Sequence, residues 1–432
     1  MTRPRGVWAA AVFATAVFVA GTATAQADGS GVTPDGAGTG AGSVSVLATA
    51  AVDQRGTVRR VVDGDTLEVD VAGDGTSTPV PVRNVGLQAM ENGDCHYAEA
   101  KAALAAAAPV GSSVRLTAAH AGSRSRGRLL RLVDVLHGTT TSDPQLAVIR
   151  AGQALPLVFP EEPSRWRAYE TAGQTAKRAG TNLWDPDYCR SGPQQGVPIR
   201  LWVNWDAEGT DTRNINGEYV RVLNAGTVPL SVGGWVIRTA AQDGFRIPAG
   251  TSIPAHATLT LRVGRGTPSG RTFYWGRTAV LFPNWYQAGT HGSGAYLFDP
   301  DGDLRASALY PCLVSCTDGR KGKLTMAVHY DAPGDDTRAN PNGEYVTVTA
   351  SSAVNLSHTV MTFNGNTLEL GGGSTLVPGQ KLVVRMGRGT ATARTKYWGR
   401  SSVVLNNGGG SVELRTTEGI RLVCKAWGSG RC

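Results

Sequence analysis

The sequence predicts a mainly β protein that combines a small β-barrel carrying helices with two immunoglobulin-like β-sandwiches. Its 432 residues include 56 glycines and 22 prolines, and short runs of alternating apolar and polar residues recur between the turns that these form. Hydrophobic residues make up 41% of the chain, which is enough for packed cores and excludes a wholly disordered protein. At about 150 residues per domain, the length predicts two or three domains.

The first 25 residues have the pattern of a secretory signal peptide. Arg3 and Arg5 precede an apolar run over residues 7–20, and small residues follow up to Ala25. The run is shorter than the roughly 20 residues that a membrane-spanning helix needs. We therefore expect a secreted, extracellular protein that has no transmembrane segment once the signal is removed. Residues 26–56 are rich in Gly, Ser, Thr and Ala and are expected to be a flexible linker.

Residues 57–190 show the order of elements that is typical of an OB-fold barrel. Three strand-like runs come first, followed by an Ala-rich helix, two more strands and two helices. Asp143 and Pro144 are a helix cap and a first helical residue, and Gly180 follows a basic last turn. The expected strands cover residues 58–62, 67–71, 79–85, 113–118 and 128–136, and the expected helices cover residues 97–108, a segment from residue 144 and residues 164–180.

The same region carries five motifs, in order, that resemble the staphylococcal nuclease-like (thermonuclease) family. They are Val61-Val-Asp-Gly-Asp-Thr-Leu67, Val82-Arg-Asn-Val-Gly-Leu-Gln-Ala-Met-Glu91, Arg126-Gly-Arg-Leu-Leu130, Ile149-Arg-Ala-Gly-Gln-Ala154 and Thr181-Asn-Leu-Trp184. The resemblance implies hydrolysis of phosphodiester bonds, with Glu91 as the base that activates water. It also implies that Arg83 and Arg128 bind the phosphate, a task that suits the planar fork of arginine.

The resemblance also implies a calcium site, and here the chain departs from the family. Asp65 matches the first metal-binding aspartate, and Ala89 can still supply a backbone carbonyl. Gln88 stands in place of the second aspartate, so a neutral oxygen replaces a charged one at a site for a hard dication. Met90 replaces the proline that normally follows. We expect weak calcium binding, and two alternatives remain for this region: an active nuclease, or a retained barrel with a degenerate site.

A basic run lies beside this candidate site, at Arg124, Arg126, Arg128 and Arg131. It either guides a polyanion or is an ordinary solvated loop.

The C-terminal half is an internal repeat. Asn216-Gly-Glu-Tyr-Val220 recurs as Asn342-Gly-Glu-Tyr-Val346, a spacing too long for a solenoid unit, so the two copies are whole domains. Further motifs, Asn224-Ala-Gly-Thr-Val-Pro-Leu-Ser-Val-Gly-Gly-Trp235 and Phe245-Arg-Ile-Pro-Ala-Gly-Thr251, resemble the lamin-tail family. The resemblance covers residues 198–317 and, more loosely, 322–432, and implies binding or scaffolding on immunoglobulin-like sandwiches. In the second copy, Met361 is expected to stand where Trp235 is in the first.

Several polar motifs of the repeats have a structural and a functional interpretation. Two acidic sets can bind calcium or form strand-connecting turns, and we favour turns. The Asp299–Asp303 segment is expected to be a hairpin loop, and the Tyr-Trp-Gly-Arg motifs at Tyr274 and Tyr397 either stack on a ligand or, as we favour, pack into the core. The acidic sets are Asp206, Asp211 and Glu218 in the first copy, and Asp331, Asp336 and Glu344 in the second.

The six cysteines suit three disulfides in an oxidising compartment. Cys95 and Cys189 are the two cysteines of the barrel region and are expected to pair. The other four lie at the ends of the two repeats, which suggests two local bridges, with one bridge between the domains as the alternative. These four are Cys312, Cys316, Cys424 and Cys432.

The excess of positive charge lies in the repeats. The whole chain carries +8, but residues 57–189 have 14 basic and 15 acidic residues, while residues 197–432 have 24 basic and 16 acidic residues. Attachment to a polyanion, either nucleic acid or a cell-wall polymer, is therefore expected in the repeats. The sequence leaves two functions: a secreted nuclease-like protein with attachment modules, or a non-catalytic extracellular binding or scaffold protein.

Overall fold

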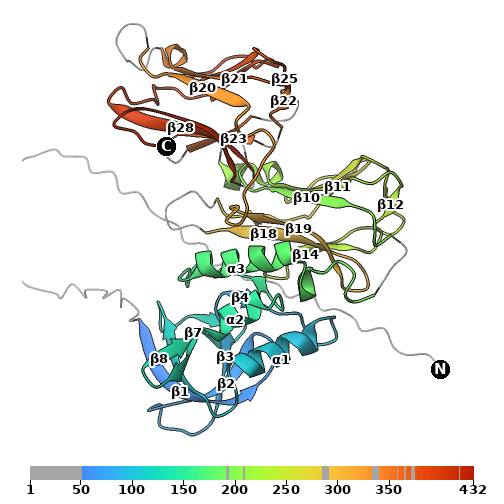
Figure 1. The fold of residues 1–432 in the computed structure, drawn as a ribbon, viewed down its shortest axis with the longest axis vertical. Coiled ribbons are helices and arrows are strands. Elements are labelled where there is room, and N and C mark those ends of the chain that lie inside the picture. The colour runs from blue at the N-terminus through green and yellow to red at the C-terminus, as the bar shows by residue number, and fades with distance from the viewer. Residues whose placement is uncertain are drawn as a thin grey trace, which may run out of the picture. The chain divides into compact units, whose positions relative to one another are not determined.

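The computed structural model describes residues 51–190, 194–207, 210–284, 291–332, 340–357, 359–363, 366–370, 375–417 and 419–432. It divides the chain into Met1–Ala48 and Thr49–Cys432. The second unit is mainly β, as predicted, and is built from several sheets (Figure 1). The expected signal peptide and residues 26–50 of the expected linker lie outside the described residues. No helix in the described part of the chain is long and apolar enough to cross a membrane.

Five strands of the N-terminal region pair in such a way that each contacts two others of the set. The order is β3-β2-β1-β5-β7, and β3 also pairs with β7 in parallel. Their bounds are β1 (Val52–Val61), β2 (Thr66–Val71), β3 (Val80–Asn84), β5 (Ser113–Ala118) and β7 (Arg128–His137). The short strands β6 (Arg124–Ser125) and β8 (Thr140–Ser142) flank β7, and β4 (Leu87–Gln88) pairs with β9 (Leu155–Pro156).

The first strand begins inside the segment that was expected to be a linker. Val52 pairs with Ala118 and Gly56 pairs with Val114, so residues 52–56 form ladder hydrogen bonds with β5. The linker prediction is therefore wrong for these residues. Their polar composition misled the sequence interpretation, because the outward positions of an antiparallel strand are polar as well.

The helices are α1 (Tyr97–Ala107), α2 (Pro144–Arg150) and α3 (Trp166–Ala179), followed by a short 3₁₀ turn, η1 (Asn182–Trp184). Capping residues predicted the start of α2 and the end of α3, whereas α1 and α3 begin after His96 and Arg165, which provide no side-chain cap. The Asp143 carboxylate accepts the Leu146 amide at 2.8 Å, and Gly180 ends α3 with a φ of 61°. Leu104 of α1 and Tyr169 of α3 join the strand valines in one buried cluster.

The first repeat has two four-stranded sheets around a common core. One sheet has the order β10-β11-β16-β17 and the other β14-β13-β18-β19. The bounds are β10 (Ile199–Asn204), β11 (Tyr219–Asn224), β16 (Thr258–Arg262), β17 (Thr272–Tyr274), β13 (Val236–Thr239), β14 (Gly244–Arg246), β18 (Ser293–Phe298) and β19 (Leu304–Tyr310), with the pair β12 (Leu230–Ser231) and β15 (Ser252–Ile253) beside them, and 3₁₀ turns η2 (Asp211–Arg213) and η3 (Ile215–Gly217). Trp205 and Trp235 pack between the sheets.

The second repeat has the same strand order. Its sheets run β20-β21-β26-β27 and β24-β23-β28-β29. The bounds are β20 (Leu324–His329), β21 (Tyr345–Ala350), β26 (Lys381–Arg385), β27 (Thr395–Tyr397), β23 (Thr359–Phe363), β24 (Asn366–Glu369), β28 (Gly409–Thr416) and β29 (Arg421–Gly428), with the pair β22 (Val354–Asn355) and β25 (Thr375–Leu376) and the 3₁₀ turn η4 (Pro341–Gly343). The repeat is therefore one of topology as well as sequence.

Strand register corrects one expected equivalence between the copies. Ile237 pairs with Leu297, immediately before the β18–β19 bulge, and Met361 pairs with Leu414, immediately before the corresponding bulge. Met361 therefore corresponds to Ile237, and the prediction that it stands where Trp235 is was wrong by two residues. A shift of two keeps the same face of a strand, so the apolar pattern could not reveal the error.

The N-terminal region and the first repeat share a hydrophobic cluster. Met90, one residue before Glu91, packs there, and no sequence pattern predicted its place in a shared core. The cluster consists of Met90, Leu155, Ala176, Leu183 and Trp184 together with Ala240, Tyr296, Phe298, Leu304 and Leu309. Helix α3 adds polar contacts, because Gln174 and Lys177 donate to the carbonyls of Pro311 and Ser307.

A buried acid on α3 lies close to this cluster. Glu170 is 2% exposed and accepts a hydrogen bond from Gln174 Nε2 at 3.0 Å. Burial raises the pKa of Glu170 to about 8. The carboxyl group therefore keeps its proton in the folded protein at pH values where the unfolded chain has lost it.

Glu170→Gln should remove part of the pH dependence of stability. Because the folded pKa lies above the unfolded value of 4.5, the free energy of unfolding falls as the pH rises from 4.5 to about 8. The contribution of this group is at most about 1.4 kcal/mol per pH unit. Urea unfolding at several pH values should give a shallower slope for the variant than for wild type and for the exposed control Glu161→Gln. An unchanged slope would contradict this assignment.

Candidate functional site

Strand register brings three of the predicted site residues together. Asp65 is the last residue of the turn before β2, where its amide donates to Asp63 Oδ1 at 2.9 Å. The next residue, Thr66, pairs with Arg83 on β3. Arg128 starts β7, whose second and third residues pair with Val82 and Arg83. The three side chains therefore come from adjacent strands at one end of the sheet.

Arg83 is held inside the protein. Its side chain is 2% exposed, and Nη2 lies 3.0 Å from Asp65 Oδ2. It also donates to the carbonyls of Asn84 and Leu87, and its guanidinium lies over the Phe159 ring. Burial lowers the pKa of the guanidinium, while the Asp65 carboxylate acts in the opposite direction. The guanidinium fixes Asp65 and can contact a phosphate only if these bonds are exchanged.

Arg128 is the more accessible of the two arginines. Its Nη1 donates to Thr66 Oγ1 at 2.7 Å and lies 3.8 Å from Asp65 Oδ1, and 24% of the side chain is exposed. Thr66 in turn donates to Asp65 Oδ1 at 3.0 Å. Arg128 is therefore already oriented toward the site, with surface left for an anion.

Asp63 is a member of the site that sequence reasoning missed. Burial, and then the charge of Asp65, raise the pKa of its carboxyl group above the ordinary value. Both acids stand in the same Asp-Gly-Asp-Thr motif, so the motif contained the signal. The result is a carboxyl pair beside Arg83, in which each acid disfavours the charged form of the other.

The residues present do not fit the calcium site that the family resemblance implies. Gln88 Oε1 accepts from Arg83 Nη2 at 3.0 Å, and its Nε2 donates to the Ala89 carbonyl at 2.8 Å. That carbonyl is the one expected to bind the ion. Asp65 Oδ2, the remaining acidic ligand, accepts the Ala89 amide and pairs with Arg83. The Gln88 amide thus engages the Ala89 carbonyl, while Arg83 and the Ala89 amide engage Asp65 Oδ2, so both oxygens that a hard dication would need already have partners.

Glu91 lies on the exposed loop that follows these residues. Its amide donates to Asp94 Oδ2 at 3.3 Å, and its carboxylate stabilises the charge of Arg83. Its Oε1 accepts a hydrogen bond from Gln242 Nε2 at 2.7 Å. Gln242 belongs to the first repeat, and nothing in the sequence pointed to this contact.

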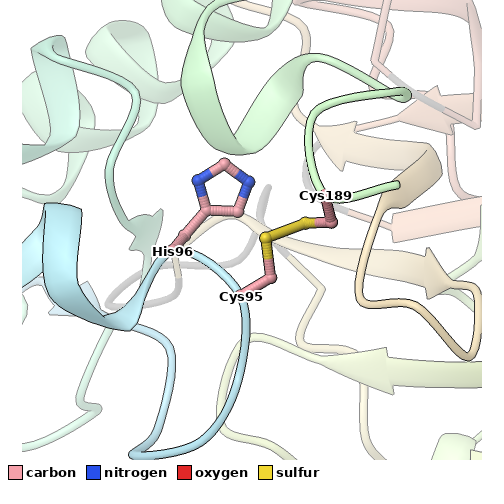
Figure 2. Close-up of side chains that lie close together, drawn as sticks. All are labelled: Cys95, His96 and Cys189. Atoms are coloured by element: carbon pink, nitrogen blue, oxygen red, sulfur yellow. A yellow bond between two sulfur atoms is a disulfide. The ribbon is translucent and has the colours of Figure 1, made fainter. Parts of the chain in front are cut away.

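The cysteines pair as the sequence suggested. Cys95 is joined to Cys189, and each repeat has a local bridge, so the alternative of one bridge between the domains is not observed. His96 lies beside Cys95 and Cys189 (Figure 2). It is 2% exposed and packs against Tyr188, with the two rings tilted by 31°. Burial lowers the pKa of His96. This is the one close group of three potential metal-binding side chains among the described residues, but its two sulfur atoms bind each other and are not thiolate ligands.

The acidic sets of the repeats form internal hydrogen bonds instead of a cation site. Asn284 donates to Asp206 at 3.2 Å and to Asp211 at 2.7 Å. Glu218 is fully buried and accepts the Leu281 amide, and burial raises its pKa to about 8. Glu344 accepts the Leu405 amide in the same way, while Asp336 lies outside the described residues. These contacts support the structural interpretation.

The aromatic–arginine motifs also have structural roles. Trp275 is buried in the first repeat, where its indole NH donates to Asp243, and Trp398 packs on Phe363 in the second. Arg400 covers the Trp398 ring. Asp299–Asp303 forms the β18–β19 hairpin loop that was expected, with the Asp299 carboxylate accepting three backbone amides.

The two-sheet geometry of the first repeat agrees with a known family. Residues 203–311 match the family model of the lamin tail domain. This lamin tail domain lies within the range 198–317 that the sequence motifs indicated, and it includes Gln242 and the Asp299–Asp303 loop. A search of the curated proteins finds no match to the chain.

A basic cleft of about 980 Å³ lies where α3, β10 of the first repeat and the start of the second repeat meet. Lys177, Arg200 and Lys323 contribute exposed cations. Arg320 also lines the cleft, but it pairs with Asp318 and donates to the Asn355 carbonyl. The cleft therefore has excess positive charge and one carboxylate, which is already neutralised.

Proposed function

We propose that this is an extracellular protein that binds a polyanionic chain through its repeats and hydrolyses phosphodiester bonds at the Glu91 site. The observation that carries the proposal is the convergence of Asp65, Arg83 and Arg128 at one end of the sheet, with Glu91 on the adjoining loop. The five-strand set, in which every strand has two partners, supports the OB-fold barrel that the family resemblance implies.

Three disulfides and the signal-like N-terminal sequence support the extracellular location, because disulfides persist in oxidising compartments.

The chemistry proposed uses the chain's own side chains. Glu91 accepts a proton from water as the water oxygen attacks phosphorus and the phosphodiester P–O bond breaks, and the leaving sugar oxygen takes a proton from solvent to become a hydroxyl group. Arg128 stabilises the charge on the phosphoryl oxygens. Since Gln88 fills the calcium position, we expect slow hydrolysis that is equal with calcium and with a chelator. The assay is cleavage of DNA and RNA by the full chain; no cleavage under either condition would refute the proposal.

A non-catalytic binding or scaffold protein is the second candidate. The Gln88 amide bonds favour it, because they tie up Arg83 as well as the Ala89 carbonyl. Polyanion binding without any cleavage is the result that would support this candidate.

Polyanion binding should depend on the basic cleft. Replacing Arg200 and Lys323 with glutamate removes two exposed cations. The slope of the log binding constant for DNA against log salt concentration should therefore become shallower by the amount that about two phosphate contacts contribute. Fluorescence anisotropy with labelled DNA at several salt concentrations measures this, and a phosphate-rich cell-wall polymer as competitor distinguishes the two ligands. Lys425→Glu, a single exposed charge reversal outside the cleft, is the control for added negative charge. Equal salt dependence in wild type, the double variant and Lys425→Glu would show that DNA binds outside the cleft.

A further inference from the structure

The β13–β14 hairpin of the lamin tail domain has an unfavourable residue at its tip. Thr239 and Asp243 close a three-residue loop, with a hydrogen bond from the Thr239 amide to the Asp243 carbonyl at 2.9 Å. Gln242, the last loop residue, has a φ of 67°, in the left-handed region. Glycine is the usual residue at this position of a three-residue hairpin, because a Cβ atom is disfavoured there. Gln242 occupies this position although the left-handed backbone conformation favours glycine.

The Gln242 side chain contacts the proposed catalytic base. Its Nε2 donates to Glu91 Oε1 at 2.7 Å. A strained residue whose side chain contacts a reactive group is the pattern expected where conformation serves function rather than stability. The amide fixes one carboxylate oxygen and leaves the second oxygen of Glu91 to accept a proton from water.

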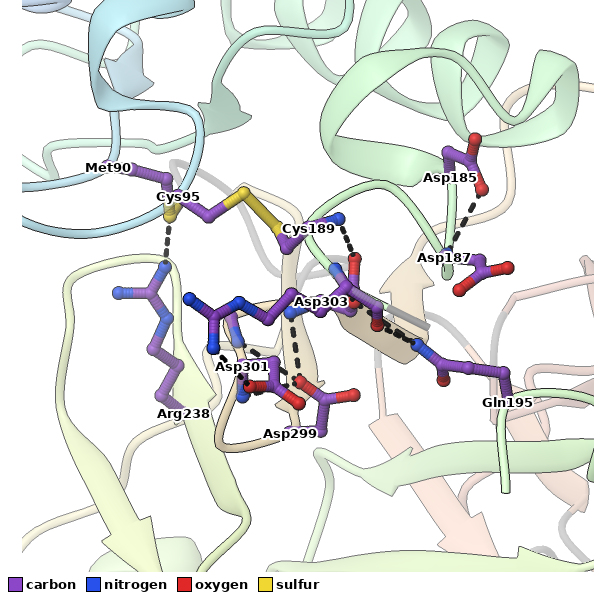
Figure 3. Close-up of a disulfide and its surroundings, with 12 residues drawn as sticks. Met90, Cys95, Asp185, Asp187, Cys189, Gln195, Arg238, Asp299, Asp301 and Asp303 are labelled. Atoms are coloured by element: carbon purple, nitrogen blue, oxygen red, sulfur yellow. Dashed lines mark hydrogen bonds and ion pairs between the residues drawn. A yellow bond between two sulfur atoms is a disulfide. The ribbon is translucent and has the colours of Figure 1, made fainter. Parts of the chain in front are cut away.

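The same hairpin also holds the residue before Glu91. Arg238 Nη2 lies 3.0 Å from Met90 Sδ (Figure 3). The Arg238 guanidinium lies 4.3 Å from the centre of the Phe298 ring. Met90 itself is 4% exposed and belongs to the hydrophobic cluster shared by the two domains. The start of the Glu91 loop is therefore attached to the lamin tail domain by apolar and polar contacts.

The other end of this loop is attached as well. Cys95 is bonded to Cys189, and the Cys189 amide donates to Asp303 Oδ1 at 2.7 Å (Figure 3). Asp303 lies in the β18–β19 loop of the lamin tail domain. A cavity of about 270 Å³, lined by Asp94, Arg238 and Arg246 among others, separates the two attachment points. The segment from Met90 to Cys95 is thus held at both ends by the second domain.

We propose that Gln242 is a positioning residue for Glu91, so that the lamin tail domain completes the hydrolytic site. The proposal rests on the hydrolytic function proposed above. It gives the lamin tail domain a role in hydrolysis in addition to the attachment to a polyanion. Glu91 and Gln242 act as one unit: the first exchanges the proton, and the second holds its carboxylate, whose charge acts on Arg83.

Gln242→Gly in the full chain separates positioning from stability. Glycine adopts a positive φ without strain, so the melting temperature should be equal to or above that of wild type. Loss of the hydrogen bond should lower kcat about tenfold with an unchanged KM, because the base is misplaced. Hydrogen–deuterium exchange of residues 89–95 should become faster. Gln242→Asn keeps a residue that tolerates a positive φ but shortens the side chain, and should reproduce the loss of kcat.

His256→Gly is the matched control. His256 also has a positive φ, at 58°, and lies in the exposed turn between β15 and β16. The change should leave kcat and the exchange of residues 89–95 as in wild type. Unchanged kcat and exchange in Gln242→Gly would overturn the proposal, and so would a higher kcat, which would make the contact inhibitory. If wild type cleaves no nucleic acid, the proposed function fails, while the exchange measurement still decides whether Gln242 orders the Glu91 loop.

Discussion

Glu91→Gln should lower kcat/KM for nucleic acid hydrolysis by about 100-fold or more, the usual contribution of a general base. Glutamine has nearly the same size and still hydrogen-bonds to Gln242, but it cannot take a proton from water. The change lies on an exposed loop, so the folded structure should persist. The measurement is initial rates on DNA and RNA, with thermal unfolding to show that the variant is folded.

Glu161→Gln controls for the loss of one surface carboxylate in the same region. It should leave the rate as in wild type. Equal rates for Glu91→Gln and wild type would show that any cleavage arises elsewhere, and the nuclease assignment would be lost.

Gln88→Asp should create calcium dependence. The change removes the amide that donates to the Ala89 carbonyl and places a second carboxylate beside Asp65. Without calcium the variant should be less stable than wild type, because a third acid then joins Asp63 and Asp65 in one partly buried site. With calcium at about one hundred times its dissociation constant, the free energy of unfolding should rise by about 2.7 kcal/mol, and hydrolysis should become faster.

Thermal unfolding and hydrolysis with calcium and with chelator measure both effects. Gln88→Asn is the matched control, since it shortens the side chain equally but keeps it neutral, and it should show no calcium response. The prediction is contradicted if calcium leaves the stability of Gln88→Asp unchanged. In that case the other bonds of Asp65, to Arg83 and Thr66, are sufficient to keep the ion out.

Local signals in the sequence predicted much of the fold. Asp143, Pro144 and Gly180 placed helix ends correctly, because capping is decided by residues within one turn. The duplicated strand order followed from recurring motifs. The start of β1 was missed, since residues 52–56 lack a clear apolar face and are ordered by their pairing with β5.

The sequence predicted which residues form the candidate site better than it predicted their burial and hydrogen bonds. The family resemblance indicated Asp65, Arg83 and Arg128, which the structure brings together. It could not show that Arg83 is buried, nor that both ends of the Gln88 amide are engaged, because these depend on side-chain orientation. Gln242 was beyond sequence reasoning, since its partner Glu91 lies 151 residues earlier in a different domain.

The shared hydrophobic cluster has a consequence for how such a protein can change over generations. Met90 and Trp184 are covered by Tyr296 and Phe298, which lie far along the chain. A gene fragment that encoded the N-terminal region without the lamin tail domain would expose these side chains, and its product would tend to aggregate. We therefore expect the N-terminal region and the lamin tail domain to be inherited together. A mutation on either side of the cluster should change the stability of both.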